Sequence, residues 1–212
     1  MVDMSAEIIA SLTTAAGTLV LAIATFGSTR SANKASRFAE RSLLAGLRPL
    51  LMHAELGDGK QKIGFSDQHW IYLEGPQAAF DLADGNIYLA ISLRNVGNGI
   101  AVLQGWYPTA ARLMGDHPQP SVEQFRPQTR DLYIAAGSQG FWQGAFRDST
   151  APGFDDFVRA AKERTAITIE LLYTDMHGGQ RTVTRFSVMP AGEDKWLATV
   201  SKHWMLDGVS PR

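Results

Sequence analysis

The sequence predicts a mainly β protein: an N-terminal transmembrane helix that continues into a juxtamembrane helix, then an immunoglobulin-like β-sandwich with one short helix. Three observations lead to this prediction. A run of nineteen residues without charge or proline lies near the N-terminus, a basic segment without proline follows it, and short alternating strands separated by Gly and Pro turns fill the rest. We therefore divide the chain into an anchor (1–27), a basic helix (28–48) and a β-sandwich domain (49–212).

The uncharged run, Ile8–Phe26, has the length of a membrane span. As a helix it reaches roughly 28 Å, close to the thickness of the hydrocarbon layer of a bilayer. A cleavable signal peptide would need a basic segment before the run, and residues 1–7 contain no Lys or Arg. A buried helix of a soluble protein would need amphipathic flanks. We favour a single-pass anchor in the cell inner membrane, with the lipid bilayer as its partner.

The charges beside the run predict its orientation. Basic residues near a span are retained in the cytoplasm, and here they all follow the run, in a segment that Pro49 terminates. At 100° per residue, five of them share one helix face: Arg30, Lys34, Arg37, Arg41 and Arg48. This stripe is a solvated face that sets the topology, and it also suits anionic lipid headgroups. We expect the C-terminal domain in the cytoplasm.

A second stripe on the same helix consists of small residues. It comprises Ala6, Ala10, Thr13, Gly17 and Ala24. Small side chains allow two membrane helices to approach closely, so the stripe suggests a protein partner or a homo-oligomer formed through the helix. The alternative is chance, because more than half of the run is made of small residues.

Strand patterns begin after Pro49. Residues 87–94 alternate apolar and polar side chains, which predicts a strand with one buried face. The loop at 95–99 consists of residues that tolerate positive φ, and it is expected to join this strand to a second strand at 100–103 that pairs with the first. Residues 166–174 and 181–188 form a second predicted pair, joined by 175–180. Its inward face comprises Ile167, Ile169, Leu171 and Tyr173.

The remaining elements have weaker patterns. Short strands are expected at 50–55, 62–65, 70–73, 132–136, 141–145 and 196–204. One short helix is expected at 155–164, where apolar residues keep helical spacing. Three prolines between 115 and 128 predict a long irregular crossing.

Four features of the sequence occur together: the apolar helix, the basic helix that ends in Arg-Pro, an N-x-G-x-G-x-A turn and a Y-x-D-x-x-G hairpin. The two turn motifs consist of Asn95, Gly97, Gly99 and Ala101, and of Tyr173, Asp175 and Gly178. With these features the chain resembles a loose group of uncharacterised bacterial membrane-anchored proteins with immunoglobulin-like domains. The resemblance implies a fold and no activity.

Composition and motifs indicate no catalytic chemistry. A net charge of −1 and a pI near 6.5 argue against nucleic-acid binding. The absence of cysteine excludes disulfides, zinc–thiolate sites and thiol nucleophiles. Neither a P-loop nor a G-x-S-x-G elbow occurs, and the five histidines lack ligand spacing. We expect no cofactor, no metal and no catalytic residue.

Several residues nevertheless have two interpretations. Asp175 and His177 are an acid/base pair or, more simply, a capped turn. Gly97 and Gly99 are an anion-binding nest or a plain strand connection. Four aromatic residues would form a recognition patch if two or more were exposed, and otherwise belong to the core: Trp106, Tyr107, Phe141 and Trp142.

Two classes of function follow. The first is a membrane-anchored protein-interaction or scaffold module, an accessory subunit of a membrane-associated assembly. The alternative is an enzyme with an unrecognised loop site that acts on a membrane-proximal substrate. An inverted topology would make the chain an extracytoplasmic binding domain. We favour the interaction module because no set of converging polar residues marks an active site.

Overall fold

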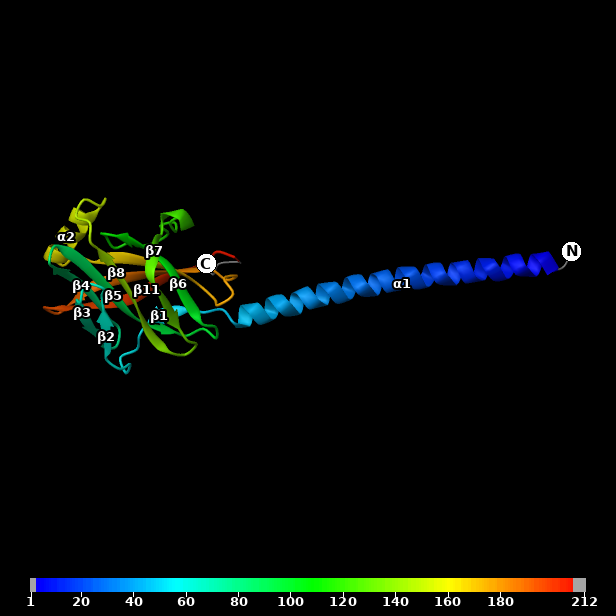
Figure 1. Ribbon diagram of the computed structural model, residues 1–212, viewed down its shortest axis with the longest axis horizontal. Coiled ribbons are helices and arrows are strands. Elements are labelled where there is room, and N and C mark those ends of the chain that lie inside the picture. The colour runs from blue at the N-terminus through cyan, green and yellow to red at the C-terminus, as the bar shows by residue number, and fades with distance from the viewer. Residues whose placement is uncertain (1–2, 208–212) are drawn as a thin grey trace. The chain divides into compact units, whose positions relative to one another are not determined.

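The computed structural model describes the backbone of residues 3–207 and the side chains of residues 15–40 and 42–207. The chain forms two compact units, and the division lies between Gly46 and Leu47 (Figure 1). The first unit is helical, and the second contains every strand that the structure describes.

The first unit is one continuous helix, α1 (Asp3–Gly46), of 44 residues. It includes both the uncharged run and most of the basic segment, as the lack of proline predicts. The helix ends before Arg48, so the prediction that Arg48 lies on its basic stripe is wrong, and Arg48 belongs to the β unit. Among the described residues, no helix combines the length and the hydropathy needed to cross a membrane. Residues 8–14 of the uncharged run lie outside the described side chains.

The second unit contains eleven described strands and two short helices. The strands are β1 (Leu51–His53), β2 (Gln61–Gly64), β3 (Trp70–Leu73), β4 (Gln77–Ala83), β5 (Asn86–Asn95), β6 (Ala101–Thr109), β7 (Arg126–Ile134), β8 (Gln139–Phe146), β9 (Ile167–Thr174), β10 (Thr182–Ala191) and β11 (Lys195–Met205). The helices are η1 (Val122–Gln124) and α2 (Phe154–Glu163). Each predicted strand is present, whereas β4 was not predicted, and β6 and β7 are longer than expected. The predicted short helix corresponds to α2.

Nine strands form one curved sheet, a half-barrel, in the order β1-β5-β4-β11-β10-β9-β6-β7, with β8 paired to β5. The sheet is continuous because β4 and β11 join through two residue pairs, Ala78–Trp196 and Gln77–Leu197. The mainly β class is therefore confirmed. An immunoglobulin-like arrangement, which has two separate sheets, is not confirmed. Strands β2 and β3 form a separate two-stranded sheet.

The two predicted strand pairs have different outcomes. Strands β9 and β10 pair as predicted, with Tyr173 opposite Thr182. Strands β5 and β6 do not pair: β5 pairs with β1, β4 and β8, and β6 with β7 and β9. The loop between them crosses from one part of the sheet to another.

Gly97 and Gly99 occupy this crossing for a steric reason. Neither has positive φ, so the tolerance of the loop residues for positive φ does not explain these two glycines. A Cβ at Gly97 would overlap the carbonyl oxygen of Arg48, and one at Gly99 would overlap that of Leu47. Only glycine admits the incoming backbone at these two positions.

Asn95 fixes the same crossing through its side chain, which is fully buried. The Leu50 and Gly97 N–H groups donate to Asn95 Oδ1 at 3.1 and 3.0 Å. Its Nδ2 donates to the carbonyl oxygens of Gly99 and Ile134 at 2.7 and 2.9 Å. The N-x-G-x-G motif is therefore a structural clamp on the segment that enters the β unit.

Strand β5 is buried on both faces, which corrects the prediction of one buried face. Its odd-numbered residues, Ile87 to Leu93, lie in the main core. On the other face, Tyr88 and Ala90 pack under the β2–β3 sheet.

Helix α2 closes one end of the main core with the buried side chains of Phe154, Phe157 and Ala160.

Candidate functional site

A row of polar residues crosses the outer face of the main sheet, on the opposite side from the core. Cross-strand register places Tyr107 of β6 opposite Glu170, Glu170 of β9 opposite Arg185, and Arg185 of β10 opposite Lys202. Residues directly opposite each other on one face of a sheet are in contact range. Four consecutive strands therefore contribute to one polar row.

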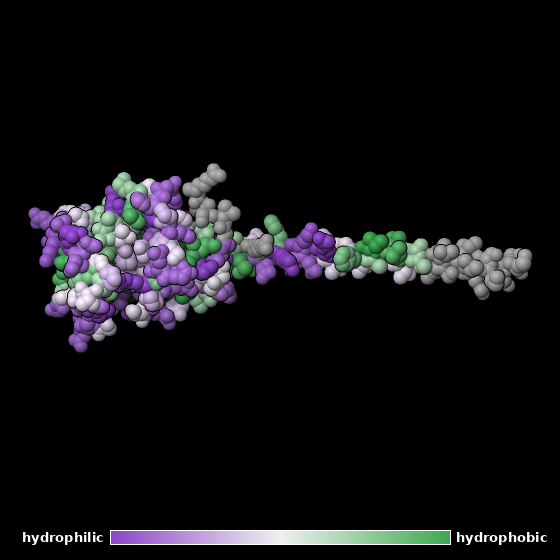
Figure 2. Space-filling model, turned by 90° about the horizontal axis from the view of Figure 1, so that it is seen from above, coloured by the Kyte–Doolittle hydropathy of each residue, from purple (hydrophilic) through white to green (hydrophobic). Residues whose placement is uncertain are grey.

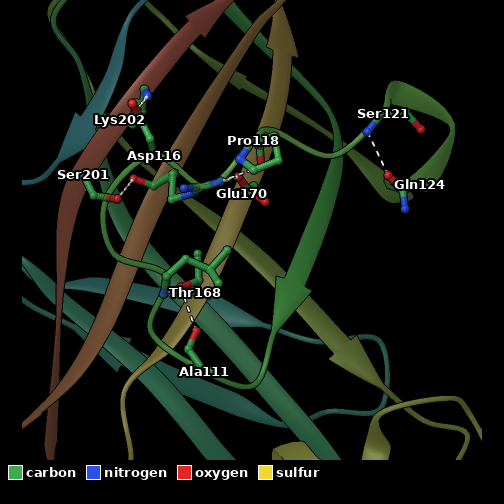
Figure 3. Close-up of polar contacts among 11 residues, drawn as sticks. Ala111, Asp116, Pro118, Ser121, Gln124, Thr168, Glu170, Ser201 and Lys202 are labelled. Carbon is green, nitrogen blue, oxygen red and sulfur yellow. Dashed lines mark hydrogen bonds and ion pairs between the residues drawn. The ribbon is translucent and has the colours of Figure 1, made fainter. Parts of the chain in front are cut away.

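The segment between β6 and β7 covers this row. Thr168 Oγ1 donates to the Ala111 carbonyl oxygen at 2.8 Å and accepts from the Leu113 N–H at 2.9 Å. Arg185 Nη2 donates to the Pro118 carbonyl oxygen at 3.1 Å. Figure 3 shows these contacts together with Lys202, whose Nζ lies 2.6 Å from Asp116 Oδ1. The irregular crossing predicted from the prolines is thus attached to the sheet by side chains of three strands.

Glu170 and Arg185 form a buried ion pair beneath this segment. Both side chains are 1% exposed, and Arg185 Nε and Nη2 each lie 2.8 Å from Glu170 Oε1. The guanidinium also lies 4.6 Å from the centroid of the Trp204 ring. Burial raises the pKa of the Glu170 carboxyl above its usual range, while its hydrogen bond to Arg185 acts in the opposite direction. Glu170 Oε2 is buried and has no hydrogen-bond partner among the described residues.

A pocket of about 420 Å³ opens beside the pair. It is lined by residues 112–116 of the covering segment and by Arg185, Ser187, Ser201 and Lys202. Ser201 is the extra residue of a β-bulge between β10 and β11, and its Oγ donates to the Arg185 carbonyl oxygen at 3.2 Å. Bulges redirect the side chains that follow them, so this one places Lys202 on the outer face beside Arg185.

A second surface lies on the β2–β3 hairpin. Trp70 and Tyr72, each 52% exposed, alternate along β3 with buried Ile71 and Leu73. Lys62 Nζ lies 4.1 Å from the Trp70 ring centroid, and Lys60 Nζ lies 4.9 Å from that of Tyr72. We call the four side chains Lys60, Lys62, Trp70 and Tyr72 the aromatic–lysine face.

A groove of about 620 Å³ runs beside this face. All four residues of β3 line it, together with Gln77–Asp81 of β4 and residues Arg164, Asp194, Lys195 and Trp196. Strand β3 pairs with β2 on one edge, and no described strand pairs with its other edge. The groove therefore follows an open strand edge.

The predicted aromatic patch is not where the exposed aromatic surface lies. Trp106 and Trp142 are 5% and 0% exposed, with ring centroids 5.3 Å apart in the main core. Tyr107 and Phe141 are half-buried. The prediction of a recognition patch that includes Trp106 and Trp142 is therefore wrong, and the alternative, that these two residues belong to the core, is confirmed.

The described part of the predicted helix stripes is exposed. Arg30, Lys34 and Arg37 lie on the surface of α1, as do Gly17 and Ala24. The other stripe residues on α1, Ala6, Ala10, Thr13 and Arg41, lie outside the described side chains. Figure 2 shows an apolar band on α1 followed along the helix by a hydrophilic band. The apolar band includes Leu19, Val20, Leu21, Ile23 and Phe26, which are 63–70% exposed.

Of the two interpretations of Asp175 and His177, an acid/base pair or a capped turn, the contacts support the capped turn. Asp175 is 4% exposed, and its Oδ1 accepts a hydrogen bond from the Gly179 N–H at 2.9 Å. His177 is exposed. Asp175 caps the turn, as expected for an Asx residue beside glycines. Within residues 3–207, no three His, Asp or Glu side chains form a group suited to a metal ion.

The polar row was not predicted from the sequence, although the sequence contains a signal for it. Glu170 is the one charged residue of β9 and Arg185 that of β10, and each lies three positions from the Tyr173–Thr182 pair. The hairpin register alone therefore places them opposite each other.

The comparisons with known proteins add no assignment: no protein-family model, no curated protein and no solved structure matches the chain.

Proposed function

We propose that this chain is a membrane-anchored protein-interaction module, an accessory or scaffold subunit of a membrane-associated assembly. Its β domain binds an extended, acidic segment of a partner protein along the open edge of β3. The observation that carries the proposal is the exposed aromatic–lysine face beside an unpaired strand edge. We also propose, as a finer assignment of the fold, an immunoglobulin-like grouping of the strands on either side of the two-pair β4–β11 junction.

The edge of β3 offers main-chain hydrogen bonds to an incoming strand. The Phe65 N–H donates to the His69 carbonyl oxygen across the β2–β3 turn. Because hydrogen-bonded and non-hydrogen-bonded pairs alternate, the backbone groups of Trp70 and Tyr72 point away from β2, toward the open edge. An extended peptide can add to such an edge as a further strand.

The side chains of the aromatic–lysine face select the partner's chemistry. Aromatic residues with restricted rotamers are common binding anchors. A Cβ at Gly64 would overlap the Trp70 ring, so the glycine leaves room for this ring to lie flat on the hairpin. Lys60 and Lys62 stand over the two rings without a carboxylate partner among the described residues. This arrangement favours carboxylates on the partner.

The anchor proposal rests on α1. Its exposed apolar residues between Leu19 and Phe26 cover more than half of the helix circumference at 100° per residue. A helix that is apolar around most of its circumference requires an apolar environment. The exposed Arg30, Lys34 and Arg37 follow this band. They support insertion in the inner membrane with the β domain in the cytoplasm, and contact with anionic lipid headgroups. The small residues Gly17 and Ala24 support contact with a partner helix or a second copy.

Site-specific photo-crosslinking tests the binding proposal. A photoreactive residue is placed at position 72 of the full chain in native membranes, and at position 133 as control, because Tyr133 is 57% exposed. We expect position 72 to capture one protein through an acidic, extended segment. A synthetic peptide of that segment should bind the purified chain and should lose affinity in Lys60→Glu/Lys62→Glu. Identical capture at positions 72 and 133, or binding insensitive to the charge reversal, would contradict the proposal.

A further inference from the structure

We propose that the pocket between residues 112–116 and strands β10 and β11 binds a small oxyanion, the carboxylate or phosphate group of a ligand. This site is on the outer face of the main sheet and is independent of the β3 edge. The proposal follows from the charges that line the pocket, from two lining residues with donors that the described chain does not use, and from the contact made by Asp116.

The lining is cationic. Arg112, Arg185 and Lys202 all contribute to it, from the covering segment and two adjacent strands, and Asp116 is the one acidic residue among the described lining residues. Asp116 is 97% exposed, whereas Arg185 is 1% exposed. Glu170 balances the charge of Arg185, and Asp116 balances that of Lys202, so Arg112 supplies the excess positive charge of the lining. A pocket with low-dielectric walls strengthens the attraction of this charge for an anion.

Two residues that line the pocket, Arg185 and Ser187, have donors that the described chain does not use. Arg185 uses Nε and Nη2 on Glu170 and Pro118, and within the described chain its Nη1 has no hydrogen-bond partner. Ser187, 2% exposed, also lines the pocket, and its hydroxyl has no partner among the described residues. Both groups are therefore available to donate to a ligand oxygen in the pocket.

Asp116 already shows how a carboxylate fits. Its Oδ1 lies 2.6 Å from Lys202 Nζ, at the mouth of the pocket. Because this carboxylate is almost fully exposed and sits on an irregular segment, a ligand anion can replace it without breaking the sheet. Glu170 remains behind Arg185 and holds the guanidinium in place through Oε1.

Binding of inorganic phosphate and of acetate to the full chain in detergent, measured by calorimetry at low ionic strength, tests this proposal. We expect saturable binding of one or both probes, and the tighter probe identifies the source of the oxyanion. Arg112→Gln should weaken binding about tenfold, because it removes one charge-assisted contact. Asp116→Asn should tighten binding, because it removes the competing carboxylate.

The matched control is Arg159→Gln, which removes an exposed arginine on α2, outside the pocket. It should leave the affinity unchanged, and all three variants should show the thermal unfolding midpoint of the unmodified chain, because each alters an exposed side chain. Two results would overturn the proposal: neither probe binds saturably, or Arg112→Gln and Arg159→Gln bind equally well.

Discussion

Removal of one partner of the Glu170–Arg185 pair should destabilise the β domain strongly, and removal of both should cost less than either single change. Each side chain is 1% exposed, so a lone charge would remain without water or counter-ion. Loss of one partner of a buried ion pair costs about 3–5 kcal/mol, whereas an apolar replacement of both is close to neutral. Arg185 also donates to the Pro118 carbonyl oxygen. We therefore expect about 4 kcal/mol for Glu170→Gln and for Arg185→Met, and about 2 kcal/mol for Glu170→Met/Arg185→Met.

The pH dependence of these variants gives a second check. Burial raises the pKa of Glu170 in the folded state, so the folded chain binds this proton more readily than the unfolded chain does. A group of this kind destabilises the fold as pH rises through its folded pKa. Arg185→Met removes the opposing interaction and raises that pKa further, so its cost should be larger at pH 8 than at pH 5.

Urea denaturation of the full chain in detergent, followed by tryptophan fluorescence, measures all three free energies of unfolding. The coupling between the two sites is the difference between the double variant and the sum of the single variants. Additivity of the two single losses within about 0.5 kcal/mol would refute the buried-pair interpretation, because independent sites add to within that margin.

Three further predictions concern the same domain. Gly99→Ala should lower the free energy of unfolding in urea by about 3 kcal/mol or more, because its Cβ would overlap the Leu47 carbonyl oxygen. Gly179→Ala, the control with open space around it, should lower it by about 1 kcal/mol or less, and equal losses would contradict the steric explanation. Asn95→Ala should lose about 3 kcal/mol and should speed hydrogen exchange of the Leu50 and Gly97 amides, and unchanged exchange would argue against the clamp. Burial lowers the pKa of His203, so the folded state binds fewer protons than the unfolded state; stability should fall as pH drops below about 6.5, and His203→Gln should remove that part of the pH dependence, which an unaltered slope would contradict.

Local patterns in the sequence were sufficient to predict most of the strands. The β9–β10 hairpin follows from apolar alternation on both sides of a Gly-rich turn, and its register is observed. Strand β4 was missed because its sequence, QAAFDLA, buries only Ala78 and Phe80 and so gives a weak alternation. Alternation also led to the prediction of one buried face for β5, since the β2–β3 hairpin that covers the other face comes from a distant part of the sequence.

The candidate sites depend on contacts that no local pattern contains. Glu170 and Arg185 occupy positions that alternate with apolar residues, which normally face water. They are buried because the segment after β6 folds back over them. The aromatic residues show the same limitation: Trp106 and Trp142 are in the core, whereas Trp70 and Tyr72 are exposed, and composition does not distinguish the two pairs.

Membrane extraction combined with a C-terminal reporter tests the central proposal most directly. We expect the full chain to remain with inner membranes after an alkaline carbonate wash and to be released by detergent. We also expect a C-terminal fusion to a reporter that is active only in the cytoplasm to give signal. Release of the chain by carbonate alone would contradict the anchor, and signal only from a reporter that requires export would contradict the cytoplasmic orientation.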